Sequence, residues 1–168
     1  MARTEIERTV RPSILDRLTD NEPGLAADPP ITREESERRY RLAVERDVEA
    51  LLNTRRVMIP APDWCPELRR SVYDYGLIDT TSISVGTKAG RERLLSALQD
   101  AIERFEPRLA HPRVRLLDAH QVRAPQMRFV VEAVLVMDPG REDVMFDTVL
   151  EIASGEYDVR DTDAPAGG

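Results

Sequence analysis

Glu106, Pro107 and Arg108 are the residues of this chain whose types and spacing could most plausibly do chemistry. They place a carboxylate and a guanidinium two residues apart, on either side of a proline. The carboxylate could act as a catalytic acid or base. The two opposite charges could instead clamp a partner protein, or the proline could simply end a helix. The tripeptide by itself is consistent with all three interpretations.

Glycoside hydrolysis is the catalytic reaction that Glu106 could serve. It requires two carboxyl groups that flank the scissile bond, about 5–5.5 Å apart for retention or 6.5–9.5 Å apart for inversion. Glu132, Asp147 or Glu151 could supply the second group. A sugar site also needs aromatic platforms, and several of the few aromatic residues fall on predicted core positions. Few aromatic residues therefore remain for a sugar site, which weighs against a glycoside hydrolase with Glu106 as general acid.

Cysteine and histidine residues offer little further chemistry. Cys65 is the only cysteine, and because it lies between Trp64 and Pro66 with no histidine nearby, we expect a passive thiol. His111 and His120 lack the cysteine and histidine spacings of metal sites. We therefore expect no metal and no cofactor.

The first of two long helices is expected to begin at Thr32 or Arg33. Thr32 is followed three residues later by Glu35, which is the pattern of a capping box. Apolar residues then recur with the helical period until the segment Leu51–Arg56, where the helix should end.

The second long helix is expected over Ala89–Phe105, where apolar residues also recur with the helical period. Pro107 cannot continue a helix and should stop it near Glu106. Before it, Glu67–Tyr73 is typical of a short helix with Leu68 and Val72 facing inward.

The last third of the sequence changes from the helical period to the alternation of β-strands. Strands are expected over Arg113–Ala119, Met127–Met137, Val144–Ile152 and Tyr157–Val159. Helices followed by a strand meander indicate an α+β fold. We expect two long helices packed on one face of a mostly antiparallel sheet of about four strands.

Residues 1–32 are expected to form an extended N-terminal arm, because prolines punctuate them. Within the arm, Ser13 could cap a helical turn that shows Ile14, Leu15 and Leu18 on one side. This apolar face either packs on its own domain or docks on another chain. Residues 33–160 should form one α+β domain, and residues 161–168 a disordered tail.

The charge of the chain is concentrated at its C-terminal end. Residues 138–168 contain nine acidic residues and two arginines, which accounts for the whole net charge of −7. The chain therefore lacks the basic face that a nucleic-acid-binding domain needs. No apolar run is long enough to insert into a membrane, so we expect a cytoplasmic protein.

Five segments in order resemble one known family. The chain is similar to TssE, the baseplate subunit of type VI secretion systems, within the phage-tail baseplate wedge proteins once labelled "lysozyme-like". The resemblance rests on Arg11–Leu18, Leu51–Arg56, Ser71–Leu77, Phe105–Leu109 and Phe146–Leu150.

The resemblance implies a structural role without enzymatic activity. The alternative function is a peptidoglycan-cleaving, lysozyme-like hydrolase that uses Glu106 as general acid, and the lysozyme label also comes from the family. Family members lie in the wedge of a contractile-tail baseplate beside TssF, TssG and TssK, and help to start assembly of the TssB–TssC sheath. The family's Glu-Pro-Arg motif, thought to hold the wedge subunits together, falls on Glu106, Pro107 and Arg108. Arg55 and Arg56 join the arm residues Ile14, Leu15 and Leu18 as further partner-binding candidates.

Two further expectations concern the interface. The edge of the acidic C-terminal strand pair either only prevents self-aggregation or also accepts a strand from a partner of opposite charge. A pairing between Glu106 and Arg108 would be screened by solvent and contribute little on its own.

Overall fold

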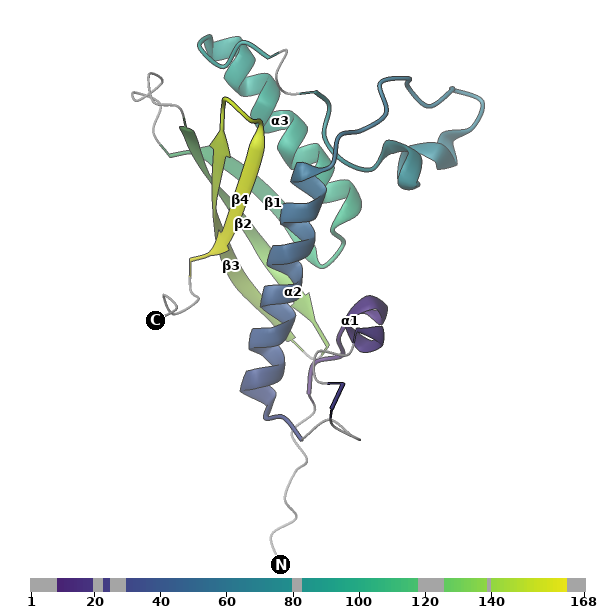
Figure 1. Ribbon diagram of the computed structural model, residues 1–168, viewed down its shortest axis with the longest axis vertical. Coiled ribbons are helices and arrows are strands. Elements are labelled where there is room, and N and C mark those ends of the chain that lie inside the picture. The colour runs from purple at the N-terminus through teal and green to yellow at the C-terminus, as the bar shows by residue number, and fades with distance from the viewer. Residues whose placement is uncertain are drawn as a thin grey trace, which may run out of the picture.

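The computed structural model describes residues 9–19, 23–24, 30–79, 83–117, 126–138 and 140–162. His120 lies outside these ranges. Helices and 3-10 helices come first along the chain, and a run of strands follows (Figure 1). The elements are α1 (Ile14–Leu18), α2 (Arg33–Asn53), η1 (Pro66–Arg70), η2 (Val72–Asp74), α3 (Lys88–Phe105), β1 (Leu109–Leu116), β2 (Gln126–Met137), β3 (Gly140–Glu151) and β4 (Glu156–Asp161).

Helix α2 begins where the sequence predicts. The Thr32 hydroxyl accepts a hydrogen bond from the Glu35 N–H at 3.2 Å, as an N-cap should. The Glu35 carboxylate pairs with Arg38 and Arg39 instead of completing a capping box, and these bonds lower the pKa of Glu35 to about 2. The helix ends at Asn53.

Helix α3 matches its predicted range and ends for the predicted reason. Thr87 caps it by accepting the Gly90 N–H at 3.0 Å. The last helical N–H is that of Glu106, which donates to the carbonyl of Ile102 at 2.9 Å. Pro107 then has no N–H with which to continue the ladder. The buried residues of the helix are Leu94, Leu98, Ala101 and Ile102.

The four strands form one antiparallel sheet in the order β1-β2-β3-β4, so the α+β prediction is confirmed. The long β2–β3 ladder pairs Val131 with Phe146 and Phe129 with Thr148. Strand β1 begins at Leu109, earlier than the expected Arg113. Its register with β2 shifts between Ala110 and Arg113, the stretch that contains Pro112.

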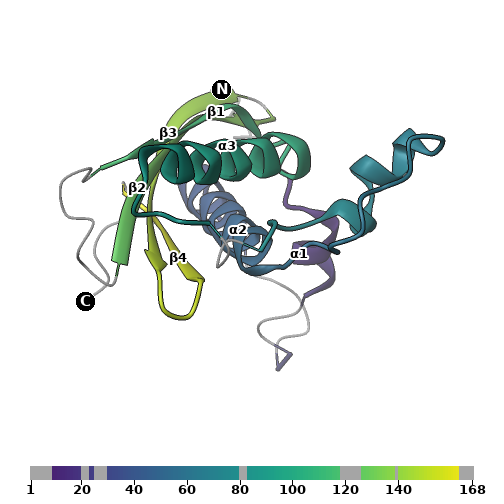
Figure 2. The ribbon, with the colours of Figure 1, turned by 90° about the horizontal axis from the view of Figure 1, so that it is seen from above.

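Each long helix contacts a different edge strand of the sheet. Helix α2 contacts β4, helix α3 contacts β1, and the two helices also contact each other (Figures 1 and 2). Apolar side chains of both helices and of the sheet form one core cluster. Its fully buried large members include Val44, Val48, Leu94, Leu98, Ile102, Phe129, Leu135 and Phe146.

The outer edge of β4 is partly occupied by side chains of α2. The Asn53 amide donates to the Tyr157 carbonyl and accepts from the Tyr157 N–H, both at 2.8 Å. Glu45 accepts the Asp161 N–H at 3.1 Å. The expectation that this edge accepts a partner strand is therefore wrong at Tyr157 and Asp161, because their main-chain groups are already bonded.

The region before α3 differs from the prediction of one short helix. It forms two 3-10 helices, because the Ser71 hydroxyl accepts the Tyr73 N–H and starts a second element there. Val72, expected to face inward, is 88% exposed. Strand β4 also reaches Asp161, the first residue of the expected tail, and residues 163–168 lie outside the described ranges.

Candidate protein interface

Within the Glu106-Pro107-Arg108 corner, the side chain of Arg108 pairs with the buried carboxylate of Glu106. Arg108 donates from Nε to Glu106 Oε1 at 2.6 Å and from Nη2 to Oε2 at 2.5 Å. The Arg108 N–H also reaches Oε1, at 3.2 Å. Glu106 is only 4% exposed, so the expectation of a solvent-screened pair is wrong. Hydrogen bonds to a buried charge are stronger than those in water.

Helix α2 supplies the second acid of the corner. Arg108 Nη2 lies 2.7 Å from Asp47 Oδ2, and the guanidinium lies over the Tyr40 ring at 5.8 Å from its centroid. Burial by itself disfavours the charged guanidinium, but the bonds and charges of Glu106 and Asp47 outweigh it and raise the pKa of Arg108. The corner is therefore locked to α2 as well as to the end of α3.

Pro107 is the exposed member of the corner. Glu106 and Arg108 fix the backbone on either side of it, and the Arg108 carbonyl accepts the Val136 N–H at 2.8 Å. Arg108 Nη1 is buried and has no hydrogen-bond partner in the described part of the chain. The corner thus presents a proline in a rigid setting, and it leaves one guanidinium nitrogen unpaired.

A chain of charges continues from the corner to the N-terminal arm. Arg46 Nη2 lies 2.8 Å from Asp47 Oδ1 and 2.8 Å from Asp16 Oδ1 in α1. Burial alone would raise the pKa of Asp16, but bonds from Ser13 and Arg46 lower it. Asp16, Arg46 and Asp47 were not predicted as site residues, since no spacing in the sequence links segments this far apart.

The arm has one buried anchor and one exposed apolar face. Val10 is 4% exposed within the core cluster, and its carbonyl accepts the Ser36 hydroxyl at 3.1 Å. Ile14, Leu15 and Leu18 are 77%, 62% and 79% exposed. The interpretation that these three side chains pack on their own domain is therefore wrong, and an apolar face next to the charge chain is open.

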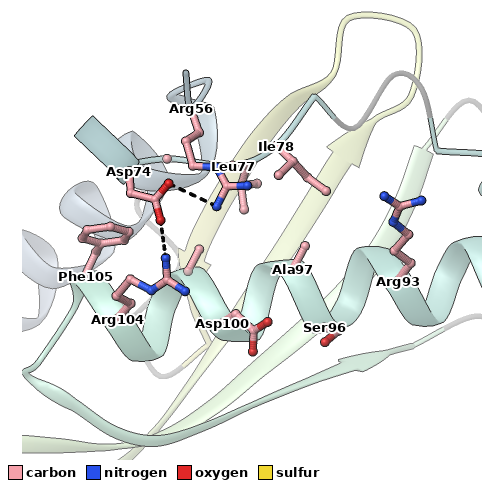
Figure 3. A pocket seen from close by; sticks show the side chains of 12 residues that line it. Arg56, Asp74, Leu77, Ile78, Arg93, Ser96, Ala97, Asp100, Arg104 and Phe105 are labelled. Carbon is pink, nitrogen blue, oxygen red and sulfur yellow. Dashed lines mark hydrogen bonds and ion pairs between the residues drawn. The ribbon is translucent and has the colours of Figure 1, made fainter. Parts of the chain in front are cut away.

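Arg56 belongs to a second charge cluster, and no ion pair in the described part of the chain joins Arg55 to it. Arg55 is exposed, whereas Arg56 Nη1 lies 3.5 Å from Asp74 Oδ1. Asp74 is 8% exposed and also accepts from Arg104 Nη1 at 2.6 Å (Figure 3). Arg56, Asp74 and Arg104 line a pocket of about 330 Å³ together with Arg93 and other residues of α3, and Arg55 does not. The cluster around Asp74 and the cluster around Arg108 share no residue.

The geometry gives the catalytic interpretation no support. Glu106 lines neither the pocket of Figure 3 nor a second pocket of about 470 Å³ on the sheet that includes His111 and Glu132. Both Glu106 oxygens are engaged by Arg108. Glu132 is paired with Arg115. Within the described ranges, no group of three or more potential metal ligands could hold an ion.

Comparison with known proteins places this arrangement in a family. A family model described as baseplate wedge protein gp25 matches residues 38–140. The chain belongs to the baseplate wedge protein gp25 family. The matched range begins in α2 and ends at the start of β3, so it contains Asp47, Glu106 and Arg108. The family resemblance inferred from the sequence is thereby confirmed.

Membership in the wedge-protein family identifies a structural component of a baseplate. No curated protein and no solved structure matches this wedge protein significantly. None of the helices in the described ranges has the length and apolar character needed to cross a membrane.

Proposed function

We propose that this wedge protein is the TssE-type subunit of a type VI secretion baseplate and has no enzymatic activity. The family match carries the proposal, because it covers the corner and the helix that locks it. In this role the protein binds TssF, TssG and TssK in the cytoplasm and helps to start assembly of the TssB–TssC sheath. Its two long helices form one layer against the sheet and hold the corner in place.

The three corner residues have different roles in binding. Pro107 is exposed and makes the direct contact, while Glu106 and Arg108 hold its backbone in one conformation. A rigid contact point loses little conformational entropy when it binds.

The N-terminal arm supplies a second contact to the wedge subunits. Ile14, Leu15 and Leu18 form an apolar face of the kind that docks in a groove of another protein. The bond between Asp16 and Arg46 ties this face to the same charge chain as the corner. Residues 1–32 thus act as an arm on a single domain of residues 33–160, with Val10 as the point where the arm is fixed.

We infer that the sheath subunit binds the sheet at β1 rather than at β4. Side chains of α2 already bond main-chain groups of β4 at Tyr157 and Asp161. In the described residues, by contrast, no side chain bonds the main chain of β1, Leu109–Leu116. A strand from a sheath subunit can add only where such groups are available.

Co-purification with TssF and TssG tests the proposal. Pro107→Ala removes the exposed ring while leaving the charge cluster intact, and it should weaken capture while lowering Tm only slightly. Arg108→Lys keeps the charge but loses the two-pronged contact with Glu106, and it should weaken capture while also lowering Tm. Arg115→Lys, in an exposed pair with Glu132, is the matched control and should change neither.

A peptidoglycan digestion assay tests the alternative function, a hydrolase. The proposal expects no release of muropeptides by the purified protein. Peptidoglycan cleavage by the wild type that is lost in Glu106→Gln would contradict the structural role. Capture of TssF and TssG that is unchanged in Pro107→Ala and in Arg108→Lys would also contradict it.

A further inference from the structure

The segment between α2 and η2 gathers apolar side chains at the surface. We call residues 57–72 the projecting loop, because Figures 1 and 2 both show this segment leaving the helices and extending away from the sheet. Five of the eleven exposed large apolar residues in the described chain lie in it, with exposures from 48% to 90%. They are Val57, Met58, Ile59, Trp64 and Val72. Several large apolar side chains exposed within one short segment are more informative than single exposed ones, because interaction surfaces are enriched in them.

The base of the projecting loop is pinned to the domain. The Arg56 N–H donates to the Leu77 carbonyl at 2.7 Å, and the Leu77 N–H donates to the Thr54 carbonyl at 2.8 Å. Gly76 has a φ of 101°, and a Cβ there would lie 2.3 Å from the Thr54 carbonyl oxygen. Only glycine allows the two ends of the loop to meet this closely. Asp74 adds its bonds to Arg56 and Arg104 (Figure 3).

The interior of the loop is also held in shape. The Tyr73 hydroxyl donates to the Ile59 carbonyl at 3.0 Å, and Arg69 pairs with Asp63 at 2.6 Å. Three prolines restrict the backbone further, at positions 60, 62 and 66. A loop ordered in this way keeps its apolar groups exposed and loses little entropy on binding.

The loop and the two residues before it differ in charge from the whole chain. Residues 55–72 contain four arginines and two acidic residues, whereas the net charge of the protein is −7. Arg70 in the loop and Arg55 just before it are exposed, while the exposed Arg69 pairs with Asp63. A complementary surface is therefore an apolar groove with acidic groups at its rim.

We propose that the projecting loop inserts into an apolar, acidic-rimmed groove of another wedge subunit, with Trp64 as its central anchor. Trp64 is 83% exposed, and tryptophan is among the residues that contribute most to interfaces when buried. This inference rests on the proposed function for the partner's identity. It concerns a surface whose residues are distinct from those of the Glu106-Pro107-Arg108 corner.

The single tryptophan makes the test direct. The full chain labelled with 5-fluorotryptophan gives one ¹⁹F resonance, because Trp64 is the only tryptophan. Adding unlabelled, purified TssF–TssG complex should shift and broaden this resonance. Trp64→Ala and Met58→Ser, measured by titration, should each weaken binding about tenfold or more. Leu117→Ser, at a 49% exposed leucine outside the loop, is the control and should bind like the wild type.

The remaining outcomes separate this inference from the proposed function. If the complex forms while the ¹⁹F resonance and the affinity of both loop variants stay unchanged, the loop proposal is contradicted and the proposed function stands. If no complex forms with the wild type, both are contradicted. If the resonance instead moves with the concentration of the chain alone, the loop binds a second copy, which also contradicts the proposal.

Discussion

Arg108 organises the charged groups at the centre of the proposed interface. It holds Glu106 with two side-chain contacts, reaches Asp47 on α2 and lies over the Tyr40 ring. Removing one member of a buried, hydrogen-bonded pair leaves the other charge buried without compensation. The residue therefore acts on stability and on binding together, and the two effects must be measured side by side.

Arg108→Ala should lower the free energy of unfolding by about 3 kcal/mol, because Glu106 would remain buried without its partner. Arg108→Ala combined with Glu106→Gln should cost less than the sum of the two single changes. Urea denaturation followed by circular dichroism measures all three. Additive costs would show that the two side chains do not act as a unit. Arg115→Ala, at an exposed pair, should cost less than about 1 kcal/mol.

Thr148 offers a stabilising change in the core. It is 1% exposed, and its hydroxyl oxygen has no hydrogen-bond partner in the described structure. Thr148→Val keeps the branched shape and removes a buried, unsatisfied polar group, so it should raise stability by about 1 kcal/mol. Differential scanning calorimetry gives the change in Tm. A lower Tm would mean that the hydroxyl does have a partner.

At the scale of elements, the chain uses α2 as its central connector. The helix contacts β4 through Asn53 and Glu45, the corner through Asp47, and the arm through Arg46. Its ends and buried face could be predicted from the capping residue and the helical period. The polar contacts of α2 could not be predicted from the sequence, because they depend on which residues of other elements lie next to the helix in the folded protein.

Glu45 makes the contact between α2 and β4 sensitive to pH. Burial raises the pKa of Glu45 above its ordinary value, with smaller contributions from the charges of Asp161, Glu49 and Asp158, against the opposing bond from the Asp161 N–H. A raised folded-state pKa means that stability is greatest below the unfolded pKa and is lost as pH rises through the folded value. Glu45→Gln should therefore raise Tm at pH 7.

The advantage of Glu45→Gln should shrink as the pH falls toward about 4, where the wild-type carboxyl is itself protonated. Thermal melts at both pH values measure it. Glu103→Gln, at an exposed position on α3, is the control. An advantage that is equal at both pH values would contradict the assignment to charge burial.

Substitutions in the N-terminal arm should affect stability at one position and binding at others. Val10→Ala should lower stability by about 1–2 kcal/mol, because it removes buried apolar surface from the core. Ile14→Ala with Leu18→Ala should change stability by less than about 0.5 kcal/mol, because both side chains are exposed. Denaturation and TssF–TssG capture are measured on the same samples. The account is contradicted if the double variant unfolds more easily but binds normally.

For the whole molecule, local patterns predict the fold better than the interface. The strand alternation placed β2 and β3 within a few residues, and Pro107 fixed the end of α3. Sequence also pointed to the corner, yet it could not show that Glu106 is buried against Arg108 and Asp47. The projecting loop was missed because prolines and mixed polarity indicate a loop without indicating its exposure.

The central claim is that this protein is a structural part of the baseplate wedge. Light scattering coupled to size-exclusion chromatography, on purified TssF–TssG with and without the chain, tests it most directly. We expect a stable complex whose mass increases by a whole number of copies of the 19.0 kDa chain. A chain that elutes alone at every ratio, and leaves the mass of TssF–TssG unchanged, would contradict the account.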